Sequence, residues 1–209
     1  NMEFADFDPN GFPSKEQVVD YFVAYAEMIK VPIRCDVEVK EVRRNVGRPG
    51  FRIETSDGIF EANNVVAATG PFQCPLIPDF KFENNRITQI HSSQYHNPDQ
   101  LPEGGVLVIG AGSSGAQIAD ELLRAGKSVH LSVGPHDLPP RSYRGRDFVW
   151  WLGVLGKWEA VTKDPGTEHI TIAVSGAHGG QTVDFRGLAE RGIILLGRTH
   201  SVKKNVMRF

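Results

Sequence analysis

The chain of 209 residues contains very little cysteine and almost no net charge. Its two cysteines, Cys35 and Cys74, lie far apart in the sequence and form no C-x-x-C pair. This usage argues against a disulfide-rich scaffold and a redox dithiol, and it fits a reducing compartment, so we expect a cytoplasmic protein. The formal net charge of −2 argues against a nucleic-acid partner, because binding to a phosphate backbone usually needs a basic surface.

Other patterns are also absent. No stretch approaches the roughly 18 consecutive apolar residues of a transmembrane helix, so no membrane span is expected. None of the seven histidines has the spacing of a metal site such as H-E-x-x-H, and we predict no bound metal. The sequence contains no G-x-S-x-G motif, which would indicate a nucleophilic serine. At this length a single buried core suffices without a disulfide or a metal ion.

The N-terminal third predicts one helix followed by a small antiparallel sheet. Ser14 and Gln17 have the spacing of a capping box. Apolar residues then recur at intervals of three and four from Val18 to Ile29, so we expect a helix with one buried face. Ser56-Asp57-Gly58 is typical of a hairpin turn. Strands are expected over residues 33–43, 51–55, 59–61 and 63–68, the last of them buried.

Several prolines between Gly70 and Asp79 indicate a linker, and we place a domain boundary after Gly70. Residues 71–209 then alternate between strands and helices, as α/β domains do. Strands are expected over residues 106–109, 128–133, 170–174 and 193–196. Helices are expected over residues 113–125, 148–152 and 184–191. We expect the three tryptophans, which have near-helical spacing, to pack in the core: Trp150, Trp151 and Trp158.

A G-x-G-x-x-G motif, Gly110 to Gly115, follows the strand over 106–109 and begins the next helix. In this context the motif binds a dinucleotide: the first glycine permits a tight turn, the second admits the pyrophosphate, and the third lets helix and strand pack closely. The helix N-terminus favours the negative charge. The alternative is a glycine-rich turn without a ligand. The residues predicted to bind the pyrophosphate are Gly110, Gly112, Ser113, Ser114 and Gly115.

The residues after the second strand of this βαβ unit favour NADP over NAD. An NAD site has an acidic residue there, which accepts a hydrogen bond from the ribose and would repel a 2′-phosphate. Residues 131–136 contain no acid. Arg141, Arg144 and Arg146 follow shortly downstream and are candidates to supply the cation for a 2′-phosphate. The alternative is that these arginines lie in a solvated loop or pair with Asp137 and Asp147. The residues predicted to surround the 2′-phosphate are Ser132, His136 and Arg141.

Three stretches resemble the flavin-containing monooxygenases and related bacterial flavoproteins. Ala68-Thr69-Gly70 resembles the A-T-G stretch at which that family's chain leaves the FAD domain for the NADPH domain. His91-Ser92-x-x-Tyr95 resembles the end of the monooxygenase fingerprint. Residues 108–115 resemble the family's second dinucleotide site, which takes NADPH. The resemblance covers nearly the whole chain.

The resemblance implies an α/β fold, with a partial FAD-domain β-meander over 1–70 and a Rossmann-like three-layer NADPH-binding domain over 71–209. It implies that Thr69 and Gly70 approach the flavin. His91 and Tyr95 are expected to line the cofactor cleft, with a surface loop as the alternative. In this family NADPH reduces FAD, and the reduced flavin activates O2 to oxygenate a small-molecule substrate.

The chain contains one G-x-G-x-x-G motif, whereas the family has another near its N-terminus for the ADP part of FAD. We therefore expect an internal piece of such an enzyme, which binds NADP by itself and FAD only within a full-length parent. The alternatives are a non-catalytic NADP-binding or structural module and a flavin disulfide reductase, although the missing C-x-x-C argues against the latter. A homodimer that covers exposed apolar surface of the meander is compatible with the sequence.

Overall fold

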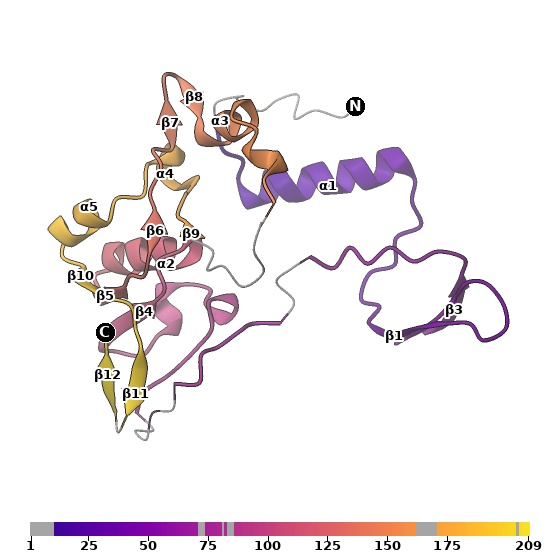
Figure 1. Cartoon of the computed structure of the whole chain (residues 1–209), viewed down its shortest axis with the longest axis horizontal. Helices are drawn as coiled ribbons and strands as arrows, with labels where there is room; N and C mark the ends of the chain where they lie inside the picture. The colour runs from indigo at the N-terminus through magenta and orange to yellow at the C-terminus, as the bar shows by residue number, and fades with distance from the viewer. Residues whose placement is uncertain (1–10, 71–73, 81, 83–85, 162–170, 204) are drawn as a thin grey trace. The chain divides into compact units, whose positions relative to one another are not determined.

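The computed structural model describes residues 11–70, 74–80, 82, 86–161, 171–203 and 205–209. Their contacts divide the chain into two units (Figure 1). The first unit is formed by Pro13–Cys74. The second is formed by Pro75–Phe209 together with Phe12.

The first unit contains a capped helix and a three-stranded antiparallel sheet in the order β1-β2-β3. Gln17 N–H donates to the Ser14 hydroxyl at 3.3 Å, and Ser14 N–H donates to the Gln17 side chain at 2.8 Å, so the predicted capping box is confirmed. The expected buried face is wrong, since the helix has no buried residue and Phe22 is 63% exposed. The elements are α1 (Lys15–Ile29), β1 (Val39–Arg44), β2 (Phe51–Thr55) and β3 (Gly58–Ala62).

The predicted hairpin of the first unit is confirmed, but the strand expected after it is not. Phe51 pairs with Ala62 and Thr55 pairs with Gly58, across the turn at Ser56-Asp57. Residues 63–68 form no strand, and Val66 is 85% exposed. A buried strand needs a neighbouring strand to pair with, and the described part of the chain offers none to this segment.

The second unit is built on a parallel sheet in the order β10-β5-β4. Each of these strands was predicted from the sequence, and so was the helix α2, which lies between β4 and β5 along the chain. The α/β fold class is therefore confirmed. The helices and main strands are β4 (Gly105–Ile109), α2 (Ser113–Arg124), β5 (Ser128–Ser132), α3 (Phe148–Val154), α4 (Ala177–Gly180), α5 (Phe185–Glu190) and β10 (Ile194–Leu196).

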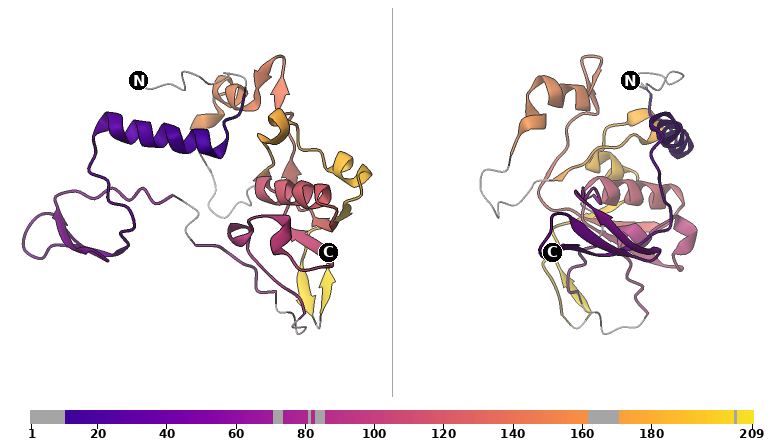
Figure 2. Two further views of the ribbon diagram at one scale, coloured as in Figure 1. Left: turned by 180° about the vertical axis from the view of Figure 1, so that it is seen from behind. Right: turned by 90° about the vertical axis from the view of Figure 1, so that its right-hand side faces the viewer.

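The strands stand in the order third, second, first along the chain, as in one half of a dinucleotide-binding sheet. α2 packs on β4 and β5, and α5 contacts β10 (Figure 2). Leu122 of α2 and Val129 and Leu131 of β5 are fully buried at the centre of the core. Because the strands are parallel, their carboxyl ends meet at one edge of the sheet, next to the N-terminus of α2.

Short elements complete the second unit. β6 pairs in parallel with β9, β7 forms a hairpin with β8, and β11 forms a hairpin with β12. The strand expected over 170–174 is shorter than predicted, and its first residue, Ile170, lies outside the described residues. These elements are η1 (Ser92–Gln94), η2 (Pro98–Gln100), β6 (His136–Asp137), β7 (Ser142–Tyr143), β8 (Arg146–Asp147), η3 (Lys157–Glu159), β9 (Thr171–Ile172), β11 (Ser201–Lys203) and β12 (Val206–Arg208).

The tryptophans only partly follow the prediction of core packing. Trp150 is 45% exposed and Trp158 is 60% exposed, so neither belongs to the core. Trp151 is half-buried, and its Nε1–H donates to the Tyr143 carbonyl oxygen at 3.0 Å. Within the residues that the structure describes, two of the three tryptophans therefore lie at the surface.

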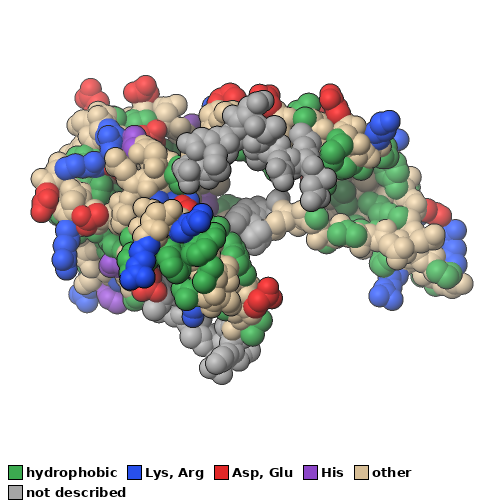
Figure 3. Space-filling model, turned by 90° about the horizontal axis from the view of Figure 1, so that it is seen from above, with side chains coloured by type: hydrophobic (Ala, Val, Ile, Leu, Met, Phe, Trp, Pro, Cys, Tyr) green, Lys and Arg blue, Asp and Glu red, His purple; other side chains and the backbone are tan. Residues whose placement is uncertain are grey.

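The surface carries charges of both signs. On the face drawn in Figure 3, acidic and basic side chains lie interspersed among hydrophobic ones. Of the helices that the structure describes, none is long and apolar enough to cross a membrane.

Candidate nucleotide-binding site

The turn between β4 and α2 has the geometry that the glycine motif predicts. Gly110 has a φ of +98°, a backbone conformation that only glycine adopts readily. Its N–H donates to the Ser132 carbonyl oxygen at 3.1 Å. This bond fixes the turn to the end of β5, so the glycine loop lies at the carboxyl edge of the sheet.

Gly115 allows α2 to lie directly against this turn. A Cβ atom at Gly115 would lie 1.9 Å from the Gly110 carbonyl oxygen, which belongs to the backbone and cannot move aside cheaply. Gly112 is the N-cap of α2 and supplies no side-chain cap. The first N–H groups of a helix have no partner within the helix, so this N-terminus suits an anionic group such as a pyrophosphate.

The side chains of the two serines in the motif face other parts of the unit. The Ser113 hydroxyl accepts a hydrogen bond from Val174 N–H at 3.2 Å and contacts the Ile172 carbonyl oxygen at 3.4 Å. It thereby holds the chain that follows β9. Ser114 lines a different cavity, described below. Any contribution of these residues to pyrophosphate binding is therefore made by the backbone.

A cleft of about 350 Å³ opens beside the glycine loop. Four of the predicted site residues meet in it: Gly110, Gly112, Ser132 and His136. The remaining lining residues come from the ends of the strands and from the segment before β4: Pro78, Phe80, Ile109, Ala111, Gly134, Pro135, Arg198 and Thr199. The cleft thus lies where open parallel sheets bind their ligands, outside the carboxyl ends of the strands.

Ser132 and His136 are both held by hydrogen bonds to backbone carbonyl oxygens. Ser132 is 2% exposed, and its hydroxyl donates to the Gly197 carbonyl oxygen at 2.8 Å. The His136 Nδ1–H donates to the Gly134 carbonyl oxygen at 2.8 Å, and the ring packs edge-on against Phe185. The Ser132 side chain therefore secures the chain after β10 and is not directed at a ligand.

Arg141 does not line the cleft. Its Nε lies 3.0 Å from a carboxylate oxygen of Asp147, and its guanidinium lies 4.6 Å from the centre of the Phe12 ring. The pairing with Asp147 is the alternative that the sequence left open. Arg198, which follows β10, lines the cleft instead and was not predicted from the sequence. Its position directly after a predicted strand could have indicated it, because the carboxyl ends of parallel strands lie at one edge of the sheet.

His91 and Tyr95 also lie away from the cleft. The His91 ring accepts a hydrogen bond from Ser93 N–H at 3.2 Å and begins η1. The Tyr95 hydroxyl donates to Glu121 of α2 at 2.8 Å, and burial together with this carboxylate raises the pKa of Tyr95. Thr69 and Gly70 belong to the first unit. Within the second unit, the structure therefore does not bring His91 and Tyr95 into the cleft beside the glycine loop.

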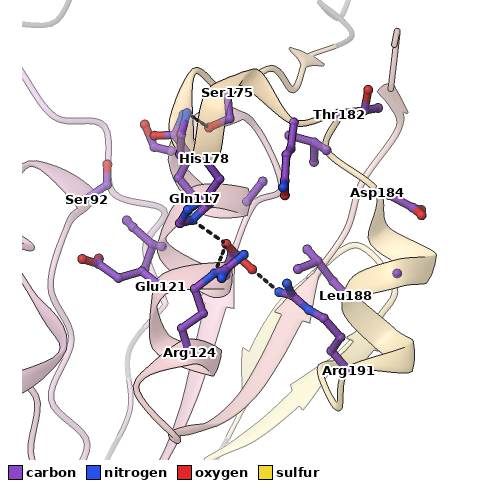
Figure 4. Close-up of a pocket in the computed structure, with 18 of the residues that line it drawn as sticks. Ser92, Gln117, Glu121, Arg124, Ser175, His178, Thr182, Asp184, Leu188 and Arg191 are labelled. Carbon is purple, nitrogen blue, oxygen red and sulfur yellow. Dashed lines mark hydrogen bonds and ion pairs between the residues drawn. The ribbon is translucent and has the colours of Figure 1, made fainter. Parts of the chain in front are cut away.

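A larger cavity of about 740 Å³ lies beside α2 on its side toward α4 and α5 (Figure 4). Asp120 is its central acceptor, paired with Arg124 at 2.8 Å, with Arg191, and with His178 at 3.6 Å. Burial alone would raise the pKa of Asp120, but the hydrogen bonds from Arg124 and Arg191 lower it below its usual value. The Arg191 pair joins α2 to the end of α5, and the Arg124 pair lies within α2 itself.

Comparison with known proteins identifies the family of the chain. Residues 4–144 match the model of the pyridine nucleotide-disulphide oxidoreductase family. A CzcO-like oxidoreductase of Geobacillus kaustophilus is 43% identical over 152 residues, which cover 71% of this chain and 42% of that protein. A probable indole-3-pyruvate monooxygenase of Arabidopsis thaliana is 28% identical over 137 residues, which cover 63% of this chain and 32% of that protein.

Solved structures support the same fold. A flavin monooxygenase from Stenotrophomonas maltophilia superposes with a TM-score of 0.64 at 19% identity, covering 94% of this chain and 52% of that chain. A bacillithiol disulfide reductase from Bacillus cereus superposes with a TM-score of 0.60 at 18% identity, covering 96% of this chain and 51% of that chain. The chain therefore spans about half the length of these proteins.

Proposed function

The chain belongs to the pyridine nucleotide-disulphide oxidoreductase family, and from this premise we propose that its second unit binds NADP(H) for a flavin-dependent oxidoreductase of the monooxygenase type. The observation that carries the proposal is the glycine turn at the carboxyl edge of the parallel sheet. Gly110 turns the chain, Gly115 brings α2 against that turn, and Gly112 leaves the helix N-terminus open to the cleft.

The residues of the cleft fit a dinucleotide. The backbone of Gly110 to Gly115 would bind the pyrophosphate, because unpartnered N–H groups and the helix dipole both favour an anion. Arg198 and His136 line the same cleft, and none of the described residues lining it is acidic, which favours a phosphorylated ribose. When bound, NADPH supplies a hydride and FAD supplies the oxygen-activating flavin, so the protein's task is to hold and orient them.

We further propose that the first unit belongs to an FAD domain, with the boundary predicted after Gly70. The β1-β2-β3 sheet supports this assignment as the expected meander. Thr69 and Gly70 stay predicted neighbours of the flavin, and a small molecule stays the predicted substrate. This assignment concerns the whole enzyme. Curated relatives such as the Geobacillus protein are more than twice as long as the part that aligns with this chain.

Within the part of the enzyme that this chain covers, the cysteines favour monooxygenase chemistry over disulfide reduction. A dithiol that exchanges with a disulfide substrate needs two thiols within reach of each other. Cys35 and Cys74 are the only cysteines of the sequence, both are exposed, and they form no C-x-x-C motif. The relatives named as monooxygenases agree with this choice.

Calorimetric titration of the chain with NADPH tests the proposal. The parent chain should bind, and Gly112→Val should lose at least about tenfold in affinity, because a branched side chain would occupy the approach of the pyrophosphate. Gly105→Val is the matched control, since a Cβ there meets only the Ser128 carbonyl oxygen at 3.9 Å. Equal affinity in the parent and in Gly112→Val would refute the site.

A further inference from the structure

The ends of β5 and β10 lie side by side at the edge of the cleft. Leu196 pairs with Ser132, and Val133 N–H donates to the Leu196 carbonyl oxygen at 2.9 Å. The residues that follow each strand are therefore neighbours. In a dinucleotide-binding sheet, the end of the second strand is where the ribose of the adenosine is recognised.

Ser132 holds the segment after β10 in place. Besides its bond to Gly197, the buried hydroxyl accepts a hydrogen bond from Thr199 N–H at 3.1 Å and lies 2.8 Å from the Thr199 hydroxyl. These contacts fix the residue before Arg198 and the residue after it. A buried polar group that is satisfied in this way rigidifies its neighbours, so the backbone of Arg198 is anchored at the cleft.

The Arg198 side chain extends across Gly134, which has no side chain of its own. A Cβ atom at Gly134 would lie 3.8 Å from both Cγ and Cδ of Arg198, so the aliphatic stem of the arginine passes over this glycine. Both residues line the cleft, whose described lining contains no carboxylate. A guanidinium can form paired hydrogen bonds to a phosphate, which makes arginine well suited to recognise one.

We propose that Arg198, anchored by Ser132 and Thr199, selects nucleotides that carry a phosphate on the adenosine ribose. This inference rests on the proposed function and deepens it, because it assigns the choice between NADP and NAD to the end of β10. Arg198 thereby takes the role that the sequence predicted for Arg141, whose guanidinium pairs with Asp147 and stacks on Phe12. Ser132 is a positioning residue in this scheme and does not itself contact the phosphate.

The test compares two ligand pairs that differ only in the ribose phosphate, NADP+ against NAD+ and 2′,5′-ADP against 5′-AMP, by calorimetry. Arg198→Ala should weaken NADP+ and 2′,5′-ADP by about ten- to a hundredfold, the range of one charge-assisted contact. The affinities for NAD+ and 5′-AMP should change little. Arg198→Lys, which keeps the charge without the fork, should fall between. Arg141→Ala should keep the preference of the parent chain.

A double-mutant cycle tests the role of Ser132. Ser132→Ala should reduce the preference for 2′,5′-ADP over 5′-AMP, and it should add almost nothing when Arg198 is already alanine. If Ser132 had a merely structural role, Ser132→Ala would weaken the binding of both nucleotides equally, whether residue 198 is arginine or alanine. Circular dichroism of each variant confirms that it is folded.

The outcomes separate the two proposals. Binding of NADP+ and NAD+ by the parent chain, with an unchanged preference in Arg198→Ala, would overturn the assignment of Arg198 and leave the proposed function intact. A preference that disappears in Arg141→Ala alone would do the same. If the parent chain binds none of the four nucleotides, the proposed function fails and this inference fails with it.

Discussion

At the scale of single residues, Gly115 illustrates how one missing side chain positions a helix. A Cβ at this position would lie 1.9 Å from a backbone oxygen of Gly110. Alanine favours a helix over glycine by about 1 kcal/mol, but overpacking against an immobile backbone costs about 1–3 kcal/mol. The clash is therefore expected to outweigh the gain in helix propensity.

We accordingly predict that Gly115→Ala lowers the free energy of unfolding by about 1 kcal/mol and weakens NADP+ binding. The substitution displaces α2 from the turn that receives the pyrophosphate. Urea denaturation and calorimetry measure the two effects. Gly105→Ala, whose Cβ would make only an ordinary contact at 3.9 Å, serves as the control. A Gly115→Ala chain as stable as the parent would show that α2 does not lie so close to the turn.

Asp120 supports a second prediction at this scale. Its pKa is lowered in the folded state by Arg124 and Arg191, so its contribution to stability is present above its ordinary pKa of 3.8 and is lost progressively as the pH falls from that value through the lowered pKa. Asp120→Asn should therefore cost about 1 kcal/mol near neutral pH and clearly less at about pH 3.

Urea denaturation at the two pH values measures the effect of Asp120. Asp99→Asn, at an exposed position whose residue forms no ion pair among those described, is the matched control and should be neutral at both. The same loss of stability for Asp120→Asn at both pH values would mean that the charge of Asp120 contributes nothing.

At the scale of elements, the tryptophans of the second unit differ in what they do. Trp151 ties α3 to the β7–β8 hairpin through its hydrogen bond to the Tyr143 carbonyl oxygen, whereas Trp158 is 60% exposed. Trp151→Phe removes the donor and should lower the free energy of unfolding by about 1 kcal/mol. Trp158→Phe should be close to neutral. Thermal unfolding of the two variants measures this difference, and equal effects would contradict the contact at Trp151.

The sequence predicts elements best where a local pattern determines them. The capping box at Ser14 and the glycine motif from Gly110 are local, and both are found where they were expected. The strand over 63–68 was wrong because a strand depends on pairing partners that its own apolar residues do not reveal. Arg198 was missed for a similar reason, since it reaches the cleft only through the pairing of β10 with β5.

At the scale of the whole molecule, the sequence contains one G-x-G-x-x-G motif, whereas the proposed function involves two dinucleotides, NADP(H) and FAD. FAD in this architecture needs its own strand, turn and helix N-terminus for the pyrophosphate. We therefore predict that this 209-residue chain, purified by itself, is colourless and still binds NADPH. Absorbance near 450 nm, measured after purification in the presence of FAD, tests this prediction. A yellow protein with stoichiometric flavin would contradict it.

The central claim, that NADP(H) binds beside the glycine turn, is tested most directly by titrating 15N-labelled chain with NADP+ and following the amide resonances. We predict saturable shifts at Gly110 to Gly115 and at Arg198 and Thr199, with β1, β2 and β3 unaffected. Shifts confined to the cavity around Asp120, or no shifts at ligand concentrations that saturate the calorimetric signal, would contradict it.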